Sequence, residues 1–365
     1  MSISSIASND SSSTPRRQQW FIDDGSGNPD QGRQNILELF ARARKEGKVV
    51  RIAAPMVRYS RLPFRLLVKE FGCDLTYTPM MIAREFKNSP HARRADFSTC
   101  ADEGPVIAQF GASNASDLVE AVKLVRGYVS GVGINCGCPI KEQNAIGIGA
   151  ALMKKLPTVV GMVTALRQNF GTDLVVDVKI RIHKNTDETV EFARAVAEAG
   201  ANIITVHGRQ HKQRNASKPD LQAIRKVRQG VPANVYVVAN GDCFNESDVS
   251  MMHELTGCDG VMAARGLLTN PALFSGYQRT PWRAVELAWA LVDEFTAARQ
   301  AALPFRNFQY MLAEMTAYLL TKDERAELRE FKTWDELQAW VDARFYLARA
   351  GDPGFAQRDY EGYRR

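Results

Sequence analysis

Residues 174–180 read Leu-Val-Val-Asp-Val-Lys-Ile, and residues 202–206 read Asn-Ile-Ile-Thr-Val. Both runs are short, nearly continuously apolar and rich in β-branched residues, a pattern typical of parallel strands that are buried on both faces. Between them, residues 186–199 carry apolar side chains at the spacing of a helix. Gly200 follows them, and a glycine at this position is typical of the end of a helix. This stretch predicts two parallel strands joined by a helix.

The same unit repeats on both sides of this stretch. Six further apolar runs predict strands at 50–54, 74–78, 106–110, 131–135, 235–239 and 259–263. The intervening segments predict helices at 63–70, 115–125, 156–168, 221–229 and 247–255. Eight such units favour the α/β class and a (β/α)8 TIM barrel. A doubly wound open sheet would need a glycine-rich turn after its first strand, whereas here that strand runs into Ala53-Ala54-Pro55-Met56.

The flanks of the barrel differ from it in composition. Residues 1–30 are polar and Ser-rich and predict a disordered tail, and residues 31–47 predict a lead-in helix before a barrel that spans 48–278. After Pro281 the strand pattern stops, and helices are expected at 283–299, 305–320, 322–331 and 334–347, within a C-terminal helical domain at 279–348. Thr333 and Glu336 form a capping-box pattern, and residues 349–365 read as a loose tail.

Composition excludes several classes of protein. The 365 residues are 45% hydrophobic and 24% charged, which is a globular composition, and no run approaches the length of a membrane helix. The start lacks a secretory signal, so an intracellular location, cytoplasmic or nuclear, is expected. Six cysteines without an even framework indicate free thiols. The net charge is +6 and its excess falls on residues 48–278, which fits an anionic partner.

Polar residues follow most of the predicted strands. Because active sites of these barrels form at the carboxyl ends of the strands, the residues that end each run predict one common site. They are Pro55-Met56-Val57-Arg58, Gln109, Asn135-Cys136-Gly137-Cys138-Pro139, Lys179-Ile180-Arg181, His207-Gly208-Arg209, Asn240-Gly241-Asp242 and Ala264-Arg265-Gly266.

The last two strand ends match a phosphate site. Gly241 and Gly266 would expose backbone N–H groups beside Asn240 and Arg265, and an Arg fork matches phosphate oxygens. The alternative is a pair of turn glycines beside a surface arginine.

Lys179 and His207 end otherwise apolar strands. A buried ammonium needs a polar or anionic partner, so Lys179 is either a cofactor contact or a Schiff-base nucleophile. A lysine that reaches solvent past the rim and a structural histidine are the simpler alternatives. The charged run 209–214 would suit phosphates or a solvated loop equally well.

Cys136 and Cys138 have the wrong spacing for a zinc ribbon or a redox pair, and no metal is expected. Cys138 precedes Pro139 and a glycine-containing segment, so it could act as a proton donor or nucleophile over the mouth of the barrel. The other five cysteines read as small apolar residues.

Taken together, these motifs resemble the tRNA-dihydrouridine synthases over residues 48–278. The resemblance is carried by Ala54-Pro55-Met56-Val57-Arg58, Asn135-x-Gly137-Cys138-Pro139, Val178-Lys179-Ile180-Arg181, Thr205-Val206-His207-Gly208-Arg209, Ala239-Asn240-Gly241-Asp242 and Gly260-Val261-Met262-x-x-Arg265-Gly266. Residues 77–80 and 270–277 look more like the eukaryotic branch that acts on D-loop positions 20a and 20b.

The resemblance implies an FMN-dependent reduction of the C5=C6 bond of a tRNA uridine, with NADPH as the reductant and Cys138 as the general acid. It implies FMN binding by Pro55, Met56, Val57, Gln109, Lys179, His207, Asn240, Gly241, Asp242, Ala264 and Arg265. Asn135, Arg181 and Arg209 are assigned to the substrate, the C-terminal helices to tRNA, and the chain is expected to be a monomer.

Three other functions stay open. One is a flavin reductase of free pyrimidines, and another is an aldolase that uses Lys179. The third is a tRNA-binding paralogue without catalysis, because Gly133 and Ile146 stand where the family often has acidic residues.

Overall fold

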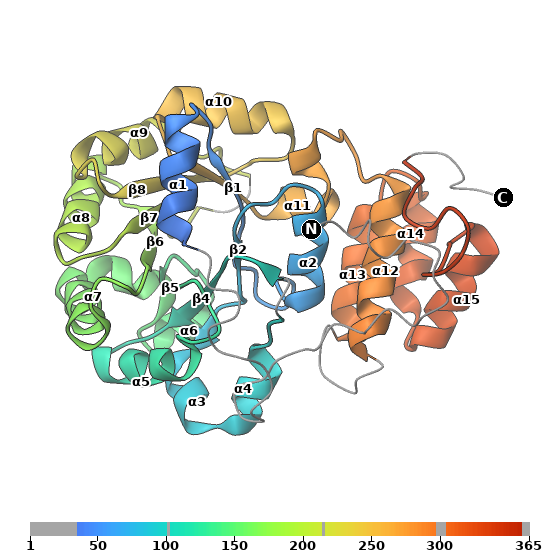
Figure 1. Cartoon of the computed structure of the whole chain (residues 1–365), viewed down its shortest axis with the longest axis horizontal. Coiled ribbons are helices and arrows are strands. Elements are labelled where there is room, and N and C mark those ends of the chain that lie inside the picture. Colours follow the sequence, from blue (N-terminus) through green and yellow to red (C-terminus); the bar gives the residue numbers. More distant parts are fainter. Residues whose placement is uncertain (1–34, 101–102, 214–215, 297–303, 360–365) are drawn as a thin grey trace.

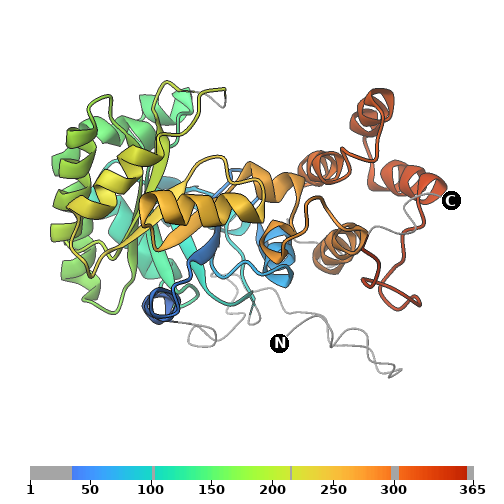
Figure 2. The ribbon, with the colours of Figure 1, turned by 90° about the horizontal axis from the view of Figure 1, so that it is seen from above.

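The computed structural model describes residues 35–100, 103–213, 216–296 and 304–359. A ring of strands lies at the centre of the larger part, and helices surround it (Figure 1). The C-terminal helices gather at one side of this barrel, as the view from above also shows (Figure 2). The predicted disordered tail at 1–30 lies outside the described residues.

The strands form one parallel sheet that closes on itself. Within the described ranges they are β1 (Val50–Ala53), β2 (Thr76–Tyr77), β3 (Met81–Ile82), β4 (Val106–Gly111), β5 (Gly131–Cys136), β6 (Val176–Ile182), β7 (Ile203–Gln210), β8 (Tyr236–Asn240) and β9 (Gly260–Ala263). Their order is β1-β9-β8-β7-β6-β5-β4-β2, and β3 pairs with β4. A parallel bridge joins Ile52 on β1 to Leu75, the residue just before β2, so the ring closes and the predicted TIM barrel is confirmed.

The second predicted strand is shorter in the structure, and a strand that was not predicted follows it. The run at 74–78 forms only β2, and a further strand, β3, follows at Met81–Ile82. Pro79 lies between them, and a proline has no N–H group to offer to the ladder. The short helices after β3 were also missed, although Ser89 caps the second of them and Pro90 begins it.

The helices around the barrel include those predicted between its strands, together with short ones that were not predicted. They are α2 (Leu62–Glu70), α3 (Ala83–Asn88), α4 (Pro90–Asp96), α5 (Ala115–Val125), α6 (Lys141–Ala145), α7 (Leu156–Phe170), α8 (Thr186–Glu198), α9 (Leu221–Gly230), α10 (Glu246–Thr256) and α11 (Arg265–Thr269), with 3-10 turns η3 (Gly149–Lys154) and η4 (Leu273–Ser275). Their buried faces pack with the outward faces of the strands in one large hydrophobic cluster.

The lead-in helix closes the amino-terminal end of the barrel. It is α1 (Ile36–Lys45), capped by the side chain of Asn35. Ile36 and Phe40 are fully buried and join the cluster of side chains that fills the barrel interior. The Phe40 ring stacks on Tyr236, the first residue of β8, at 4.8 Å between ring centroids. The predicted site lies at the other end of the barrel, at the carboxyl ends of the strands.

The C-terminal helices pack against α2 and α11, and their buried side chains continue the large hydrophobic cluster of the barrel. They are α12 (Trp282–Thr296), α13 (Phe305–Met315), α14 (Lys322–Glu330) and α15 (Trp334–Arg344). Trp289 meets Phe308 edge-on at 5.2 Å, and Trp334 lies against both rings. The predicted capping box at Thr333 and Glu336 is present.

The predicted loose tail from residue 349 is wrong for residues 349–359. The carboxylate of Glu286 on α12 is fully buried and accepts hydrogen bonds from Ala348 N at 3.3 Å and Ala356 N at 2.9 Å. It also pairs with Arg358. Because a buried carboxylate requires such donors, the segment folds back along α12. Residues 360–365 lie outside the described residues.

Within the described residues no single helix is long and apolar enough to cross a membrane. One pair, residues 141–154 and 156–170, meets the length and composition criteria jointly, but it is bent by 92°.

Candidate active site

The strand register places the predicted site residues next to one another. Asn135 on β5 is the neighbour of Lys179 on β6, and Arg181 is the neighbour of His207 on β7. His207 is in turn the neighbour of Asn240 on β8. In a parallel barrel, neighbours in register point to the same face, so these side chains lie in the interior near its carboxyl end.

Asn135 organises the turn that carries Cys138. Its Oδ1 accepts the backbone N–H groups of Gly137 at 3.0 Å and Cys138 at 2.8 Å. Its Nδ2 donates to Oε1 of Gln109 at 2.7 Å. The amide of Asn135 is therefore largely used within the protein, and its assignment to the substrate stays a prediction.

The loop after Cys138 folds back on it. The carbonyl oxygen of Cys138 accepts Ala150 N at 2.9 Å and the side chain of Asn144 at 3.3 Å. Gly149 has a φ of +66°, and a Cβ atom there would lie 2.7 Å from this carbonyl oxygen, so only glycine fits. The loop thus binds the carbonyl oxygen of Cys138, while Asn135 binds its N–H group.

Cys138 differs from the other cysteines in exposure. Five of the six cysteines are buried, and the sixth, Cys138, is partly accessible to solvent. Partial burial raises its pKa, and the opposing influences of a backbone hydrogen bond at Ile140 and of the Arg181 and Lys179 charges are smaller. Its sulfur is consequently a thiol at neutral pH, the form that can donate a proton.

Lys179 is a buried cation. Its Nζ donates to Oδ1 of Asn240 at 3.0 Å, and Asn240 Nδ2 donates to the carbonyl oxygen of Met262 at 2.9 Å. Burial lowers the pKa of Lys179 to about 8, with a further contribution from the charge of Arg181. The simple alternative of a lysine reaching solvent is wrong, because the residue is only 9% exposed.

Two arginines share one carboxylate at the ends of β7 to β9. Asp242 pairs with Arg209 and with Arg265, the latter at 2.7 Å. Nη1 of Arg209 also lies 3.3 Å from Nε2 of His207. Burial, followed by the charges of Lys179, Arg181, Arg209 and Arg265, lowers the pKa of His207 to about 2. Its imidazole is therefore neutral, and the positive charge of this corner resides on Lys179 and the arginines.

A family comparison agrees with this arrangement. The model of the family described as dihydrouridine synthase (Dus) matches residues 51–345. The chain belongs to the dihydrouridine synthase family. That match covers the barrel and extends through α15, so the C-terminal helices are part of the family's architecture.

Curated proteins of the dihydrouridine synthase family cover most of the chain. A tRNA-dihydrouridine(20a/20b) synthase [NAD(P)+] from Saccharomyces cerevisiae is 43% identical over 86% of this chain and 85% of its own length. One of the same name from Schizosaccharomyces pombe is 40% identical over 86% of this chain and 93% of its own. A Homo sapiens tRNA-dihydrouridine(20a/20b) synthase [NAD(P)+]-like protein is 37% identical over 85% and 93%.

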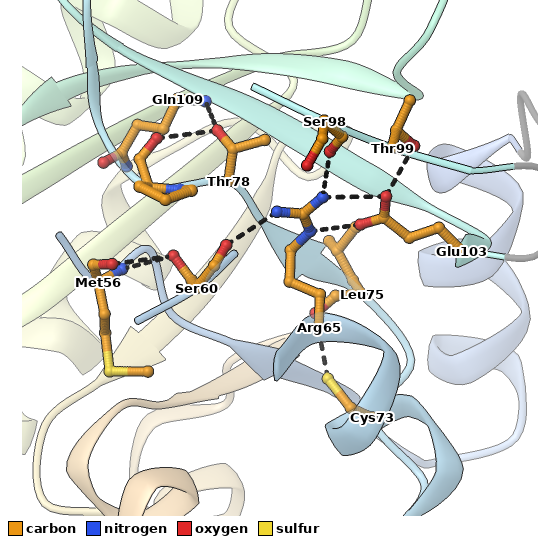
Figure 3. Close-up of polar contacts among 11 residues, drawn as sticks. Met56, Ser60, Arg65, Cys73, Leu75, Thr78, Ser98, Thr99, Glu103 and Gln109 are labelled. Atoms are coloured by element: carbon orange, nitrogen blue, oxygen red, sulfur yellow. Dashed lines mark hydrogen bonds and ion pairs between the residues drawn. The ribbon is translucent and has the colours of Figure 1, made fainter. Parts of the chain in front are cut away.

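A supporting layer of this dihydrouridine synthase site had no clear signal in the sequence. Ser60 bonds both backbone polar atoms of Met56, and Oγ1 of Thr78 accepts the N–H of Gln109 at 3.0 Å (Figure 3). Thr78 is the last residue of the strand predicted at 74–78, and Ser60 lies in the turn after the strand predicted at 50–54, so a polar side chain near a strand end is the signal that could have identified them.

Asp177 lies deeper in the barrel, two residues before Lys179. Its Oδ1 accepts Oγ1 of Thr205 at 2.9 Å, and burial raises its pKa to about 7. It is the register neighbour of Gly133, and its Oδ2 lies 3.5 Å from the point where a Gly133 Cβ would be. Asp177 thus places a buried carboxyl from the adjoining strand beside Gly133.

The remaining predicted residues are the arginines of β6 and β7 and the residues that follow β1. Arg181 donates to the carbonyl oxygens of Gly137 and Gln210, and Arg209 donates to that of Ser217. The backbone of β1 meets that of β9 at Ala54 and Ala263, which places Pro55 beside Ala264 at the mouth. Met56 is half-buried and Val57 is 39% exposed. Their roles toward cofactor and substrate stay predictions.

Proposed function

We propose that this chain reduces the C5=C6 bond of a uridine at position 20a or 20b of tRNA, using FMN and NADPH. The observation that carries the proposal is the protonated, partly exposed thiol of Cys138, held by Asn135 within the cluster that contains the buried cation Lys179. The family membership and the names of the relatives support the choice of reaction and of positions.

The residues at the mouth fit a flavin with its phosphate. Nε2 of Gln109 is buried without a hydrogen-bond partner in the described residues, so it is available to a ligand carbonyl or ring nitrogen. Lys179 supplies a positive charge, and Arg265 with a side chain 41% exposed supplies a fork suited to phosphate. Gln109, Lys179, His207, Asn240 and Arg265 would hold FMN. When bound, FMN would supply the hydride for C6 of the uracil ring.

The protein's own contribution is the placement of charge and of one proton. Lys179 and the neighbouring arginines stabilise negative charge that develops on the ligands at the mouth. The Sγ proton of Cys138 passes to C5 of the uracil, and the sulfur is left as a thiolate that solvent reprotonates. Asn135 and Gly149 keep the backbone of Cys138 fixed during this transfer.

The target base lies in a folded RNA, so it must leave its stack to reach this mouth. We propose that the C-terminal helices α12 to α15, packed beside α2 and α11, contact the tRNA body while the base enters the barrel. The positive excess of residues 48–278 supports binding of the phosphate backbone on the barrel side.

Two measurements test this function. An absorption spectrum of the purified chain should show flavin bands that bleach with NADPH under anaerobic conditions. Mapping of dihydrouridine on tRNA transcripts should then find the modification at 20a or 20b. A chain that binds no FMN, or that yields a borohydride-trapped adduct with a carbonyl substrate, contradicts the proposal. Reduction of free uracil in preference to tRNA would assign the chain to the pyrimidine reductases.

A further inference from the structure

The turn after β1 has a backbone that arginine rarely adopts. Arg58 has a φ of 79°, and it is one of three non-glycine residues with positive φ in the described ranges. A long side chain gains no local hydrogen bond that offsets this conformation, so the surroundings must hold it. The turn includes Met56 and Val57, which the sequence resemblance predicts to contact the cofactor, and strain at such a place points to a function.

The barrel side holds the base of the turn. Oγ of Ser60 accepts Met56 N at 2.9 Å and donates to Met56 O at 3.1 Å. The carbonyl oxygen of Ser60 accepts Nη1 of Arg65 at 2.9 Å, and Arg65 pairs with Glu103 in a buried ion pair (Figure 3). These contacts fix residues 56 and 60, but none of them reaches Arg58.

The C-terminal helices hold the tip of the turn. Nδ2 of Asn307 on α13 donates to the carbonyl oxygen of Arg58 at 3.0 Å. One helical turn further on, the ring of Tyr310 lies 5.4 Å from that of Tyr59. Residues three apart share one face of a helix. One face of α13 therefore contacts two successive residues of the turn, and both contacts join segments that are far apart in sequence.

We propose that Asn307 and Tyr310 are positioning residues that keep Arg58 in its left-handed conformation and so complete the cofactor site from the helical segment. This inference rests on the proposed function, because the turn matters for FMN only if FMN binds at the mouth. Its consequence is that α13 belongs to the cofactor site as well as to the proposed RNA-contacting segment. RNA that binds the helices would therefore act on the same turn that contacts the cofactor.

The test is the FMN dissociation constant of the full chain, measured by quenching of flavin fluorescence. The Asn307→Ala variant should bind FMN about three- to tenfold more weakly, as expected for the loss of one net hydrogen bond. Asn169→Ala is the matched control, because Asn169 also donates its amide to a backbone carbonyl but lies exposed on α7. Tyr310→Ala gives a second, independent change at the same turn.

A glycine at position 58 separates positioning from general support. Glycine adopts positive φ without a steric cost, so Asn307→Ala should weaken FMN binding by less than about twofold in an Arg58→Gly background. An equal loss in both backgrounds would overturn the inference. So would Asn307→Ala and Tyr310→Ala variants that fold and bind FMN like the control. If the unaltered chain binds no FMN at all, the proposed function fails instead.

Discussion

Nζ of Lys179 on β6 donates a hydrogen bond to Oδ1 of Asn240 on β8 at 3.0 Å, across the interior of the barrel and 61 residues of sequence. The contact leaves the ammonium of Lys179 with a neutral partner, and burial lowers its pKa to about 8. Within the described residues no carboxylate forms an ion pair with Lys179, although the nearby Asp177 carboxyl acts on its pKa, so the ammonium is available to a negatively charged ligand.

Replacement of Lys179 tests whether this cation serves the cofactor. Lys179→Met should weaken FMN binding at least about tenfold, while the unfolding free energy of the cofactor-free protein should not fall, because a buried charge is removed. FMN titration and urea unfolding measure the two effects. Asn240→Leu should weaken FMN binding less, since the charge remains. Unchanged FMN affinity in Lys179→Met would remove this residue from the site.

Replacement of Cys138 tests the proton donor. Cys138→Ala should retain FMN and its reduction by NADPH, but dihydrouridine formation should drop by about 10²- to 10⁴-fold, the usual contribution of a general acid. Because burial raises the pKa of this thiol, activity should hold through neutral pH and fall only as the pH rises through that pKa. Cys136→Ala, two residues away and fully buried, is the control and should remain active.

The buried carboxyl of Asp177 predicts a pH dependence of stability. Its pKa is about 7 in the folded chain, above the value near 3.9 of an exposed aspartate, so the unfolded chain loses this proton first. Its contribution to stability should therefore fall as the pH rises from about 4 to 7 and stay low above that range. Urea unfolding at several pH values should show this decrease, and Asp177→Asn should reduce it.

The exposed Asp173 provides a control for that measurement. Asp173→Asn makes the same exchange of side chains at the exposed surface and is measured alongside Asp177→Asn. An identical slope in Asp177→Asn and the unaltered chain would show that the Asp177 carboxyl ionises in the folded protein as it does in water.

The buried ion pair of Arg65 and Glu103 predicts a large loss of stability. Both side chains are at most 2% exposed, and Thr99 donates to Oε2 of Glu103 at 2.7 Å. Arg65→Met would leave the carboxylate unpaired and should cost about 3–5 kcal/mol in urea unfolding. The Arg65→Met/Glu103→Met pair should be less destabilised than Arg65→Met alone. If the loss in the double variant equalled the sum of the losses in Arg65→Met and Glu103→Met, the two residues would act independently.

The sequence was sufficient to predict the order of elements, because periodicity is a local property. Eight apolar runs and their intervening helices correspond to the barrel, and the residues that end those runs converge at one mouth. Local chemistry also identified the capping box at Thr333 and singled out Cys138 among six cysteines. Conversely, the strand predicted at 74–78 is shortened to β2, and β3 beyond Pro79 was not predicted, because two-residue strands carry almost no periodic signal.

By itself, then, the sequence determined which residues lie at the strand ends and what chemistry they carry. Only the tertiary structure decided which distant residues meet: that Asp177 faces Gly133, that Asn307 reaches Arg58, and that residues 349–359 return to Glu286. Each of these is a contact between segments that are separate in the chain. Such contacts depend on strand register and on the packing of helices against the barrel, and neither leaves a periodic signal in the sequence.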